Sequence, residues 1–353
     1  MKPLKYLFIS SMLFAATSCG NSWLDLEPST SVDTETSIKI LSDVEFTLNG
    51  IYSTMQSSDA YSGRLVYYGD VTGDDMQAVS STKRVANYYR FNFTKDDNPS
   101  SHWSYLYSII QNCNLILMNI DKLVIDEDDK AYRDDLKGEA LAIRGLALFD
   151  LTRIFGYPYL KDDGASLGVP IIEGLSTIDS KPTRNTVAQC YTKIIDDLTQ
   201  SLSLLGEKFN KGKINKWGAM VLLSRVYLYK GENANALKMA SDAIIGAEKN
   251  KYALWTNEDY PTAWGEDASA SKPGEVLFEI VNLTTDSPGK ESMGYLNSYD
   301  GYDDMCITCS FYQFLKEDPK DIRLKLLSFD KKYYAYVNKY QPQREENLSL
   351  IHI

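Results

Sequence analysis

Few residues in this chain are suited to catalysis or to binding a metal ion. Its 353 residues include five cysteines and two histidines, His102 and His352. Cys306 and Cys309 form a CxxC pair, but no second ligand pair stands at the spacing of a zinc site, and no βαβ pattern indicates a thioredoxin-like site. The sequence therefore predicts plain thiols or a local disulfide here, and neither a metal ion nor a cofactor.

Two pairs of adjacent acidic residues are the remaining candidates for acid–base chemistry, Asp74 with Asp75 and Asp303 with Asp304. A glycosidase holds its two carboxyl groups about 5–10 Å apart across one glycosidic bond, and sequence neighbours rarely present both groups in that way. A Ser-His-Asp catalytic site needs a suitably placed histidine, and the sequence offers only two histidines. The sequence predicts a binding protein and not an enzyme.

Aromatic residues are the best candidates for contacting a ligand. The chain has 25 tyrosines and five tryptophans, and such rings stack on sugar faces or contact peptide side chains. Five lie in the irregular sequence after position 250 and are our candidate binding residues: Trp255, Trp264, Tyr295, Tyr299 and Tyr302. We expect Trp264 to be the most accessible, because no helical or strand period around it would bury it. Packing of each ring on its own loop stays an open alternative.

Cys19 is the candidate for lipid attachment. Lys2 and Lys5 precede an apolar stretch from Leu7 to Ala16, and small residues then lead to Cys19. This order is typical of a bacterial lipoprotein signal peptide, residues 1–18, that is removed in the mature protein. The apolar stretch is too short to span a bilayer, so we expect acyl chains such as palmitate on Cys19 to hold the protein at a membrane.

The composition of the chain disfavours some classes of binding partner. The formal net charge is −11 and the isoelectric point is near 4.8, which disfavours binding to the phosphate backbone of nucleic acid. No later stretch reaches the eighteen or so apolar residues that a membrane span needs. The sequence therefore predicts an exported body that is anchored only through its N-terminus.

Helical periodicity predicts a mainly α fold. Apolar residues recur at helical spacing after Ser42, over 103–120, 130–154 and 186–205, and twice after Gly212. A long loop is expected over 159–181. After position 250 we expect a strand at 275–283, a loop at 286–302, short helices at 311–317 and 321–327, and a strand at 333–340.

The two helices after Gly212 carry a repeat signature. Six residues fall on the tetratricopeptide template: Leu223, Ser224, Tyr227, Gly231, Ala236 and Ala243. Small residues at these places let two antiparallel helices approach closely. The helices at 130–154 and 186–205 are interpreted as an earlier pair, so the predicted fold is a tetratricopeptide-like helical bundle with irregular loops and a few short strands.

Taken in order, these landmarks resemble the SusD/RagB family of Bacteroidetes outer-membrane lipoproteins. The resemblance rests on Cys19 with the Trp-Leu-Asp-Leu-Glu-Pro run at 23–28, and on segments 103–114, 139–158, 182–187, 217–229, 275–280 and 321–323. It implies a nutrient-binding lipoprotein of the cell outer membrane, facing the exterior, that docks on a SusC-like TonB-dependent transporter. Its ligand would be an oligosaccharide or, in RagB-like members, a peptide; a plain interaction scaffold is the other alternative.

The resemblance also implies a domain division. Residues 19–250 would form the helical region, and residues 251–353 would begin the family's C-terminal region. Family members usually continue beyond this length, so we expect an incomplete C-terminal region and, with it, part of the helical core and ligand face to be missing.

Overall fold

The computed structural model describes residues 37–94, 99–177, 179–207, 210, 212–265, 274–282, 288–340 and 350–352. The predicted signal peptide and Cys19 lie outside these residues. By its internal contacts the chain divides into two units, Met1–Lys39 and Ile40–Ile353, and every element named here belongs to the second unit. In the described part of the chain, no helix combines the length and apolar character that crossing a membrane requires.

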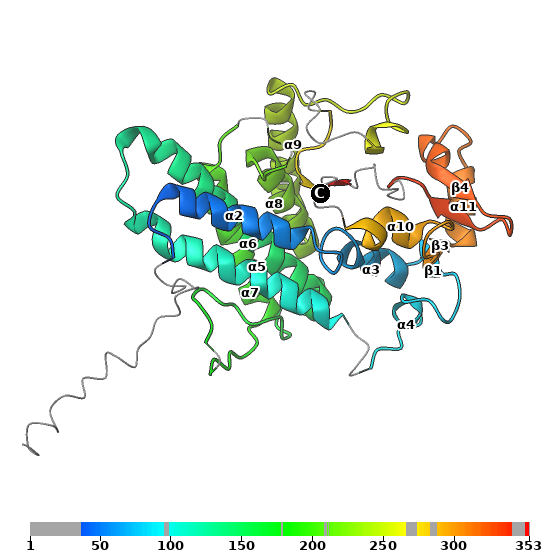
Figure 1. Ribbon diagram of the computed structural model, residues 1–353, viewed down its shortest axis with the longest axis horizontal. Coiled ribbons are helices and arrows are strands. Elements are labelled where there is room, and N and C mark those ends of the chain that lie inside the picture. Colours follow the sequence, from blue (N-terminus) through cyan, green and yellow to red (C-terminus); the bar gives the residue numbers. More distant parts are fainter. Residues whose placement is uncertain are drawn as a thin grey trace, which may run out of the picture. The chain divides into compact units, whose positions relative to one another are not determined.

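The fold is mostly helical, as predicted, and its long helices pack one on the next. They are α2 (Leu41–Met55), α5 (Ser100–Asn119), α6 (Lys130–Phe155), α7 (Val187–Leu204), α8 (Lys216–Lys230) and α9 (Asn233–Lys249). Helix α5 packs on α6, α6 on α7, α7 on α8 and α8 on α9, and Figure 1 shows this bundle with α2 beside α5 and α6. These boundaries lie within about three residues of those that periodicity predicts.

The centre of the bundle is α6, which is almost wholly buried from Leu136 to Thr152. A buried polar link ties it to α2: the hydroxyl of Tyr52 donates to Glu139 Oε2 at 2.7 Å and accepts from the backbone N–H of Ile214 at 3.0 Å. Burial raises the pKa of Glu139 to about 7, because low polarity disfavours the charged carboxylate. The link therefore ties α2 to α6 through a carboxyl group whose charge changes near neutral pH.

Helices α8 and α9 form the predicted tetratricopeptide-like pair. Gly231 ends α8 with φ +84°, a left-handed conformation that glycine adopts without strain. Ala236 and Ala243 are buried at the contact, and Ser224 Oγ donates to the carbonyl oxygen of Ala236 at 2.8 Å. Two small residues of the sequence pattern, Ala236 and Ala243, thus lie buried in the packed helix pair.

Enlarging Ala236 should destabilise this pair. Ala236→Leu is expected to lower the free energy of unfolding by about 1–3 kcal/mol, because the extra carbon atoms have no room in a close helix contact. Urea unfolding followed by circular dichroism measures the change, with Leu237→Ala as the control because Leu237 is 69% exposed on the same helix. An unchanged denaturation midpoint for Ala236→Leu would contradict the close contact.

The rest of the unit is less regular. Its helices and strands are α3 (Arg64–Thr72), β1 (Met76–Ala78), α4 (Ala86–Tyr89), β2 (Glu279–Val281), α10 (Met293–Asn297), β3 (Met305–Ile307), α11 (Cys309–Lys316), β4 (Leu327–Phe329), β5 (Ala335–Val337) and β6 (Leu350–His352). Short 3₁₀ helices cover Ile120–Lys122, Glu127–Asp129, Tyr159–Lys161, Ala263–Gly265, Gly289–Glu291 and Ile322–Leu326. Three antiparallel strand pairs form: β1 with β3, β2 with β6, and β4 with β5.

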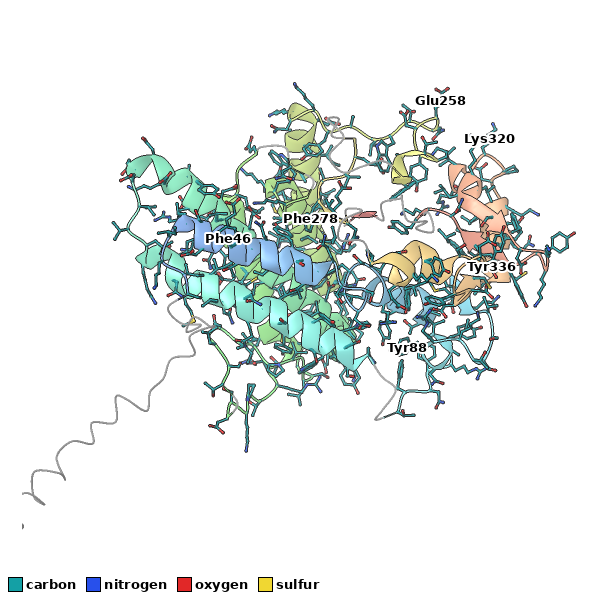
Figure 2. All side chains as sticks on the ribbon, viewed as in Figure 1. Phe46, Tyr88, Glu258, Phe278, Lys320 and Tyr336 are labelled. Atoms are coloured by element: carbon teal, nitrogen blue, oxygen red, sulfur yellow. The ribbon has the colours of Figure 1, made fainter. Side chains whose placement is uncertain are left out.

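A second core holds this irregular part together. Its buried side chains come from α3, β1, α10, β3 and β5 and the loops beside them: Tyr67, Val71, Met76, Val85, Leu296, Met305, Ile307 and Ala335. Residues more than 200 positions apart therefore share one core, and Figure 2 shows the dense side-chain packing around Tyr336 in this region.

Several predicted elements differ from the structure. The loop expected over 286–302 contains helix α10, because the Ser292 hydroxyl caps the N–H of Tyr295 at 3.3 Å. The strand expected over 333–340 is reduced to β5, since Tyr333 has φ +64° within a turn. The strand expected over 275–283 pairs only at β2, and α3, α4 and β1 were not predicted at all.

Candidate ligand-binding site

The five predicted aromatic residues fall into two separate groups. Tyr295, Tyr299 and Tyr302 lie together at α10 and the loop that follows it, and we call this group the tyrosine face. Trp255 and Trp264 pack on each other in the segment after α9, with ring centroids 5.2 Å apart. The structure thus brings the candidates together in two places, each of which has its own supporting side chains.

The tyrosine face presents two supported rings to solvent. Tyr299 is 44% and Tyr302 38% exposed. The guanidinium of Arg84 lies 4.0 Å from the centroid of the Tyr302 ring, and Tyr295 meets that ring edge-on at 5.2 Å. Tyr299 rests against the buried ring of Tyr336 at 5.7 Å. Neighbours that hold a ring in place reduce the entropy lost when a ligand stacks on it.

The loop that carries these rings is held by specific contacts. A Cβ on Gly301 would lie 2.0 Å from the backbone oxygen of Tyr295, so only glycine fits there. The Tyr336 hydroxyl donates to Asp303 Oδ1 at 2.7 Å, and Lys83 Nζ donates to the Tyr302 carbonyl oxygen at 2.7 Å. Burial, together with the hydrogen bond to Asp303, raises the pKa of the Tyr336 hydroxyl, which stays a neutral donor.

The adjacent acids Asp303 and Asp304 also serve this loop. Asp303 lies 3.4 Å from Lys83 Nζ, and the buried Asp304 lies 3.1 Å from Arg84 Nε. Each carboxylate therefore lies close to a cation, and Arg84 also pairs with Glu291 at 3.4 Å. Their contacts position Lys83 and Arg84 beneath the tyrosine face.

Trp264 is not accessible, and our expectation on this point is wrong. It is only 7% exposed, enclosed by the rings of Trp255, Tyr260 and Tyr340 at 5.2–6.2 Å. Lys339 Nζ lies 3.5 Å from the centroid of its ring, and burial lowers the pKa of that lysine. Aromatic side chains from a loop bury one another without any helical or strand period, so the absence of periodicity did not indicate exposure.

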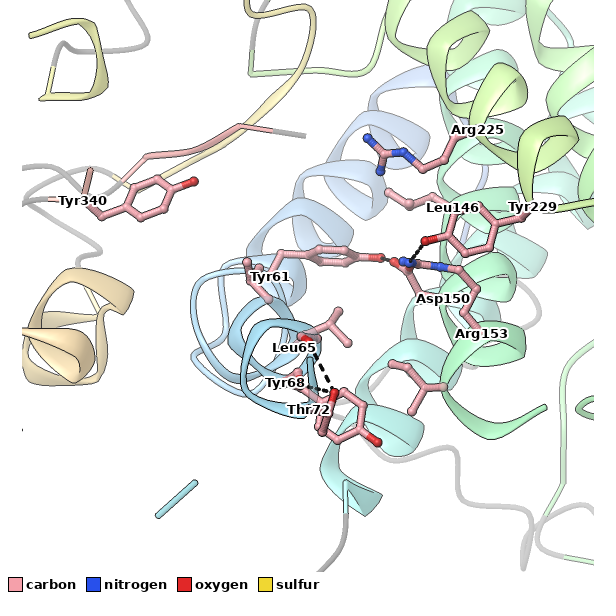
Figure 3. A pocket seen from close by; sticks show the side chains of 13 residues that line it. Tyr61, Leu65, Tyr68, Thr72, Leu146, Asp150, Arg153, Arg225, Tyr229 and Tyr340 are labelled. Carbon is pink, nitrogen blue, oxygen red and sulfur yellow. Dashed lines mark hydrogen bonds and ion pairs between the residues drawn. The ribbon is translucent and has the colours of Figure 1, made fainter. Parts of the chain in front are cut away.

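A cleft of about 560 Å³ lies between α3, α6 and α8, with Tyr340 across the opening (Figure 3). We call it the central cleft. Its lining combines tyrosines with a few charged groups: Tyr61, Tyr68, Asp150, Arg153, Arg225, Tyr229 and Tyr340, beside Leu65, Val66, Gly69, Thr72, Leu146 and Ile154. Such a mixture of apolar walls and a few polar groups is typical of ligand pockets.

Most of the charge in the central cleft is already compensated. Asp150 accepts a hydrogen bond from the Tyr61 hydroxyl at 2.6 Å and forms an ion pair with Arg153. Burial, reinforced by the Asp150 carboxylate, raises the pKa of Tyr61. Within the described part of the chain Arg225 forms no ion pair, so its guanidinium is the group through which the cleft could attract an anionic ligand group.

A third aromatic group was missed in the sequence. Tyr68, at the edge of the cleft, contacts Tyr88 at 5.4 Å, and Tyr88 contacts Phe93 at 5.8 Å. Phe91 is 65% and Phe93 41% exposed. The available signal was the density of aromatic residues, four of the six positions over 88–93. Their position beside α3 depends on tertiary contacts that this local composition does not encode.

The comparisons with known proteins identify the family. Residues 22–228, more than half of the chain, match the family model for SusD-like proteins described as "Starch-binding associating with outer membrane". The chain belongs to the SusD-like family. The resemblance inferred from the sequence landmarks is thereby confirmed.

Relatives of this SusD-like chain come from several Bacteroidetes. A solved Bacteroides vulgatus structure, provisionally described as a sugar binding protein, is 82% identical with a TM-score of 0.86, and the match covers 88% of this chain and 70% of that one. A SusD superfamily protein of Bacteroides vulgatus is 36% identical with a TM-score of 0.80, covering 86% and 69%. A SusD-like protein of Formosa agariphila is 28% identical over 85% of this chain and 57% of its own length.

The chain spans about half the length of the curated relatives that it matches, between 38% and 57%.

The cysteines of this SusD-like chain have structural positions. Cys113, Cys190 and Cys306 are buried, Cys309 is exposed, and all four are thiols without a disulfide among the described residues. Burial raises the pKa of the Cys113 thiol to about 12, which makes it inert. Among the residues described, no group of three or more His, Cys, Asp or Glu side chains is placed to hold a metal ion.

Proposed function

We propose that this SusD-like protein is a surface lipoprotein that captures an oligosaccharide and delivers it to a SusC-like TonB-dependent transporter in the outer membrane. Its family description names starch binding and association with the outer membrane, and the 82% identical relative is provisionally described as sugar-binding. We infer binding without catalysis, because the paired acids Asp303 and Asp304 are each occupied by a cation beneath the tyrosine face.

The observation that carries this proposal is the tyrosine face. Tyr299 and Tyr302 are exposed, while Tyr336, Tyr295 and Arg84 hold their rings from behind. Neutral sugars offer C–H faces that pack on aromatic rings and hydroxyl groups that hydrogen-bond with tyrosine and arginine. The face suits a neutral or weakly acidic oligosaccharide better than a compact charged ligand.

Truncating either exposed ring should weaken glycan binding. Tyr299→Ala and Tyr302→Ala are each expected to raise the Kd for an oligosaccharide by roughly 3- to 10-fold, the effect of losing about 0.6–1.4 kcal/mol of ring contact. Isothermal titration with starch-derived and other oligosaccharides measures it. Tyr132→Ala is the matched control, since Tyr132 is 41% exposed but lies on α6. Equal affinity in all three variants would contradict the role of the tyrosine face.

A second candidate function is peptide capture in the central cleft. Arg225 has no ion-pair partner among the described residues and faces the hydroxyl-rich lining of the cleft, and a guanidinium suits a peptide carboxylate. Peptide binding that Arg225→Ala weakens, without any glycan affinity, would favour this function.

An interaction scaffold is the remaining alternative. It would be favoured if the protein binds neither glycan nor peptide but co-purifies with an outer-membrane transporter.

The lipid anchor is part of the proposal. Residues 1–18 would be removed as a signal peptide, and Cys19 would carry the acyl chains, leaving residues 19–250 as the helical region and 251–353 as the beginning of the C-terminal region. Cys19→Ala is expected to release the protein from the outer-membrane fraction, because each buried CH₂ group of an acyl chain contributes about 0.8 kcal/mol. Membrane fractionation after a salt wash tests this, and a variant that stays membrane-bound would rule out the Cys19 anchor.

A further inference from the structure

The central cleft carries one positive charge that no described residue neutralises. Three charged residues line it, Asp150, Arg153 and Arg225. Asp150 is only 4% exposed, forms an ion pair with Arg153 and accepts a hydrogen bond from the Tyr61 hydroxyl at 2.6 Å. Two arginines against one aspartate leave the lining with a net charge of +1, on a chain whose formal net charge is −11. A local charge of the opposite sign favours an anion in the cleft over other parts of the surface.

The two arginines of the cleft differ in what they can still bind. The Arg153 guanidinium lies 4.8 Å from the centroid of the Phe149 ring and 5.4 Å from that of Tyr229, whose hydroxyl accepts from Nη1 at 3.5 Å. Arg225 is partly buried and forms no hydrogen bond or ion pair with the residues that the structure describes. Figure 3 shows its side chain extending from α8 towards the cleft. Its planar guanidinium can therefore meet a carboxylate through two parallel hydrogen bonds.

The rest of the lining suits a sugar ring. The volume of about 560 Å³ lies within the range of ligand pockets, about 300–1,000 Å³. The hydroxyls of Tyr68 and Tyr340 form no hydrogen bond with described residues, so each can donate to a sugar hydroxyl or accept from one. The C–H groups of the ring can pack on an apolar wall that consists of Leu65, Val66, Leu146 and Ile154.

A peptide fits this lining less well than an acidic sugar. Each peptide residue other than proline brings a backbone N–H that needs an acceptor when it is buried. Asp150, the one carboxylate that lines the cleft, is already engaged by Tyr61 and Arg153. The Thr72 hydroxyl donates to the backbone oxygen of Tyr68 at 2.8 Å. The lining thus offers hydrogen-bond donors more than acceptors, which favours a ligand that is rich in oxygen.

We propose that the central cleft is a second glycan subsite, which binds a uronic acid residue with its carboxylate on the Arg225 guanidinium. The inference deepens the proposed glycan capture and rests on it. Tyr68 and Tyr340 bind the sugar hydroxyls, and the ring lies against the apolar wall. A carboxyl group ionises well below pH 7, so a uronic acid carries one negative charge, which matches the one uncompensated arginine. A densely sulfated glycan would instead meet the net negative charge of the chain.

Matched acidic and neutral probes test the proposal by isothermal titration of the full chain. The probes are oligogalacturonates and oligoglucuronates, each compared with its methyl ester, which keeps the sugar ring and removes the charge. The free acid is expected to bind about tenfold or more tightly than the ester, because only the acid forms charge-assisted hydrogen bonds. High salt should weaken binding of the acid and leave binding of the ester unchanged.

Variants of Arg225 assign this preference to its guanidinium. Arg225→Gln should raise the Kd of the acid about tenfold or more and leave the Kd of the ester unchanged. Arg225→Lys should keep part of the preference, since an ammonium retains the charge but not the paired donors. Arg133→Gln is the matched control, because it removes the same charge near the start of α6, whereas Asp150 lies near the end of that helix. Circular dichroism confirms that each variant is folded.

The outcomes separate this subsite from the proposed function. Equal Kd values for acid and ester, or a preference that Arg225→Gln leaves intact, overturn the subsite, while binding of neutral oligosaccharides would still support glycan capture. Absence of all glycan binding overturns both. Tighter binding of sulfated oligosaccharides than of uronic acids overturns the carboxylate assignment. Binding of a peptide that Arg225→Gln weakens, without binding of any uronic acid, would assign the cleft to peptides instead.

Discussion

Asp197→Ala is expected to lower the free energy of unfolding by about 3–5 kcal/mol, because it leaves the buried guanidinium of Arg144 without its counter-ion. Asp197 is fully buried on α7 and Arg144 is 7% exposed on α6. Arg144 Nε and Nη2 donate to the two Asp197 oxygens at 2.8 and 2.6 Å. Its Nη1 donates to Asn114 Oδ1 on α5 at 2.8 Å, so three helices meet at this cation.

Chemical denaturation followed by circular dichroism tests this result with two comparisons. The double variant Arg144→Leu, Asp197→Leu should recover part of the loss, because an apolar pair leaves neither charge unpaired, whereas the buried Asn114 oxygen still loses its donor. Asp242→Ala removes the partner of Lys238 in an exposed pair on α9, and should cost about 0.5 kcal/mol or less. A similarly small loss for Asp197→Ala would show that the buried pair contributes little to stability.

The parts of the fold that follow from local pattern were predictable. Gly231 indicates a turn and Ala236 a close helix contact, and the two residues are only five positions apart. The helix pair α8–α9 that they predict is present in the structure. The end of α6 follows in the same way, since Gly156 comes directly after the last helical residue, Phe155. Helix period, caps and turn residues act within one or two turns of the chain, which is the range that a sequence pattern reports.

The candidate site depended on contacts of longer range. The central cleft joins Tyr68 on α3 to Arg225 on α8 and to Tyr340, and no spacing in the sequence connects them. The tyrosines at 295–302 were found because they cluster along the chain, but their support by Arg84 and Tyr336 comes from distant segments. Tertiary neighbours of this kind decide whether a side chain in an irregular segment is exposed. The sequence therefore identified the aromatic residues after position 250 but did not determine which of them are accessible.

The variant Trp264→Ala distinguishes the exposure expected from the sequence from the burial seen in the structure. From the sequence, Trp264→Ala would weaken ligand binding and leave the fold intact. The ring is instead buried against Trp255, Tyr260 and Tyr340, so its removal should lower the free energy of unfolding by about 3 kcal/mol through lost burial and the cavity left behind. Urea unfolding followed by the remaining tryptophan fluorescence measures this loss.

Tyr299→Ala is the matched comparison for Trp264→Ala, because Tyr299 is 44% exposed and its truncation should cost about 1 kcal/mol or less. The two variants should therefore separate stability from binding: Trp264→Ala should lower the urea midpoint, whereas Tyr299→Ala should mainly raise the Kd for an oligosaccharide. A Trp264→Ala protein with unchanged stability and weakened glycan binding would place Trp264 in the ligand site, and would mean that the rings around it contribute little to the fold.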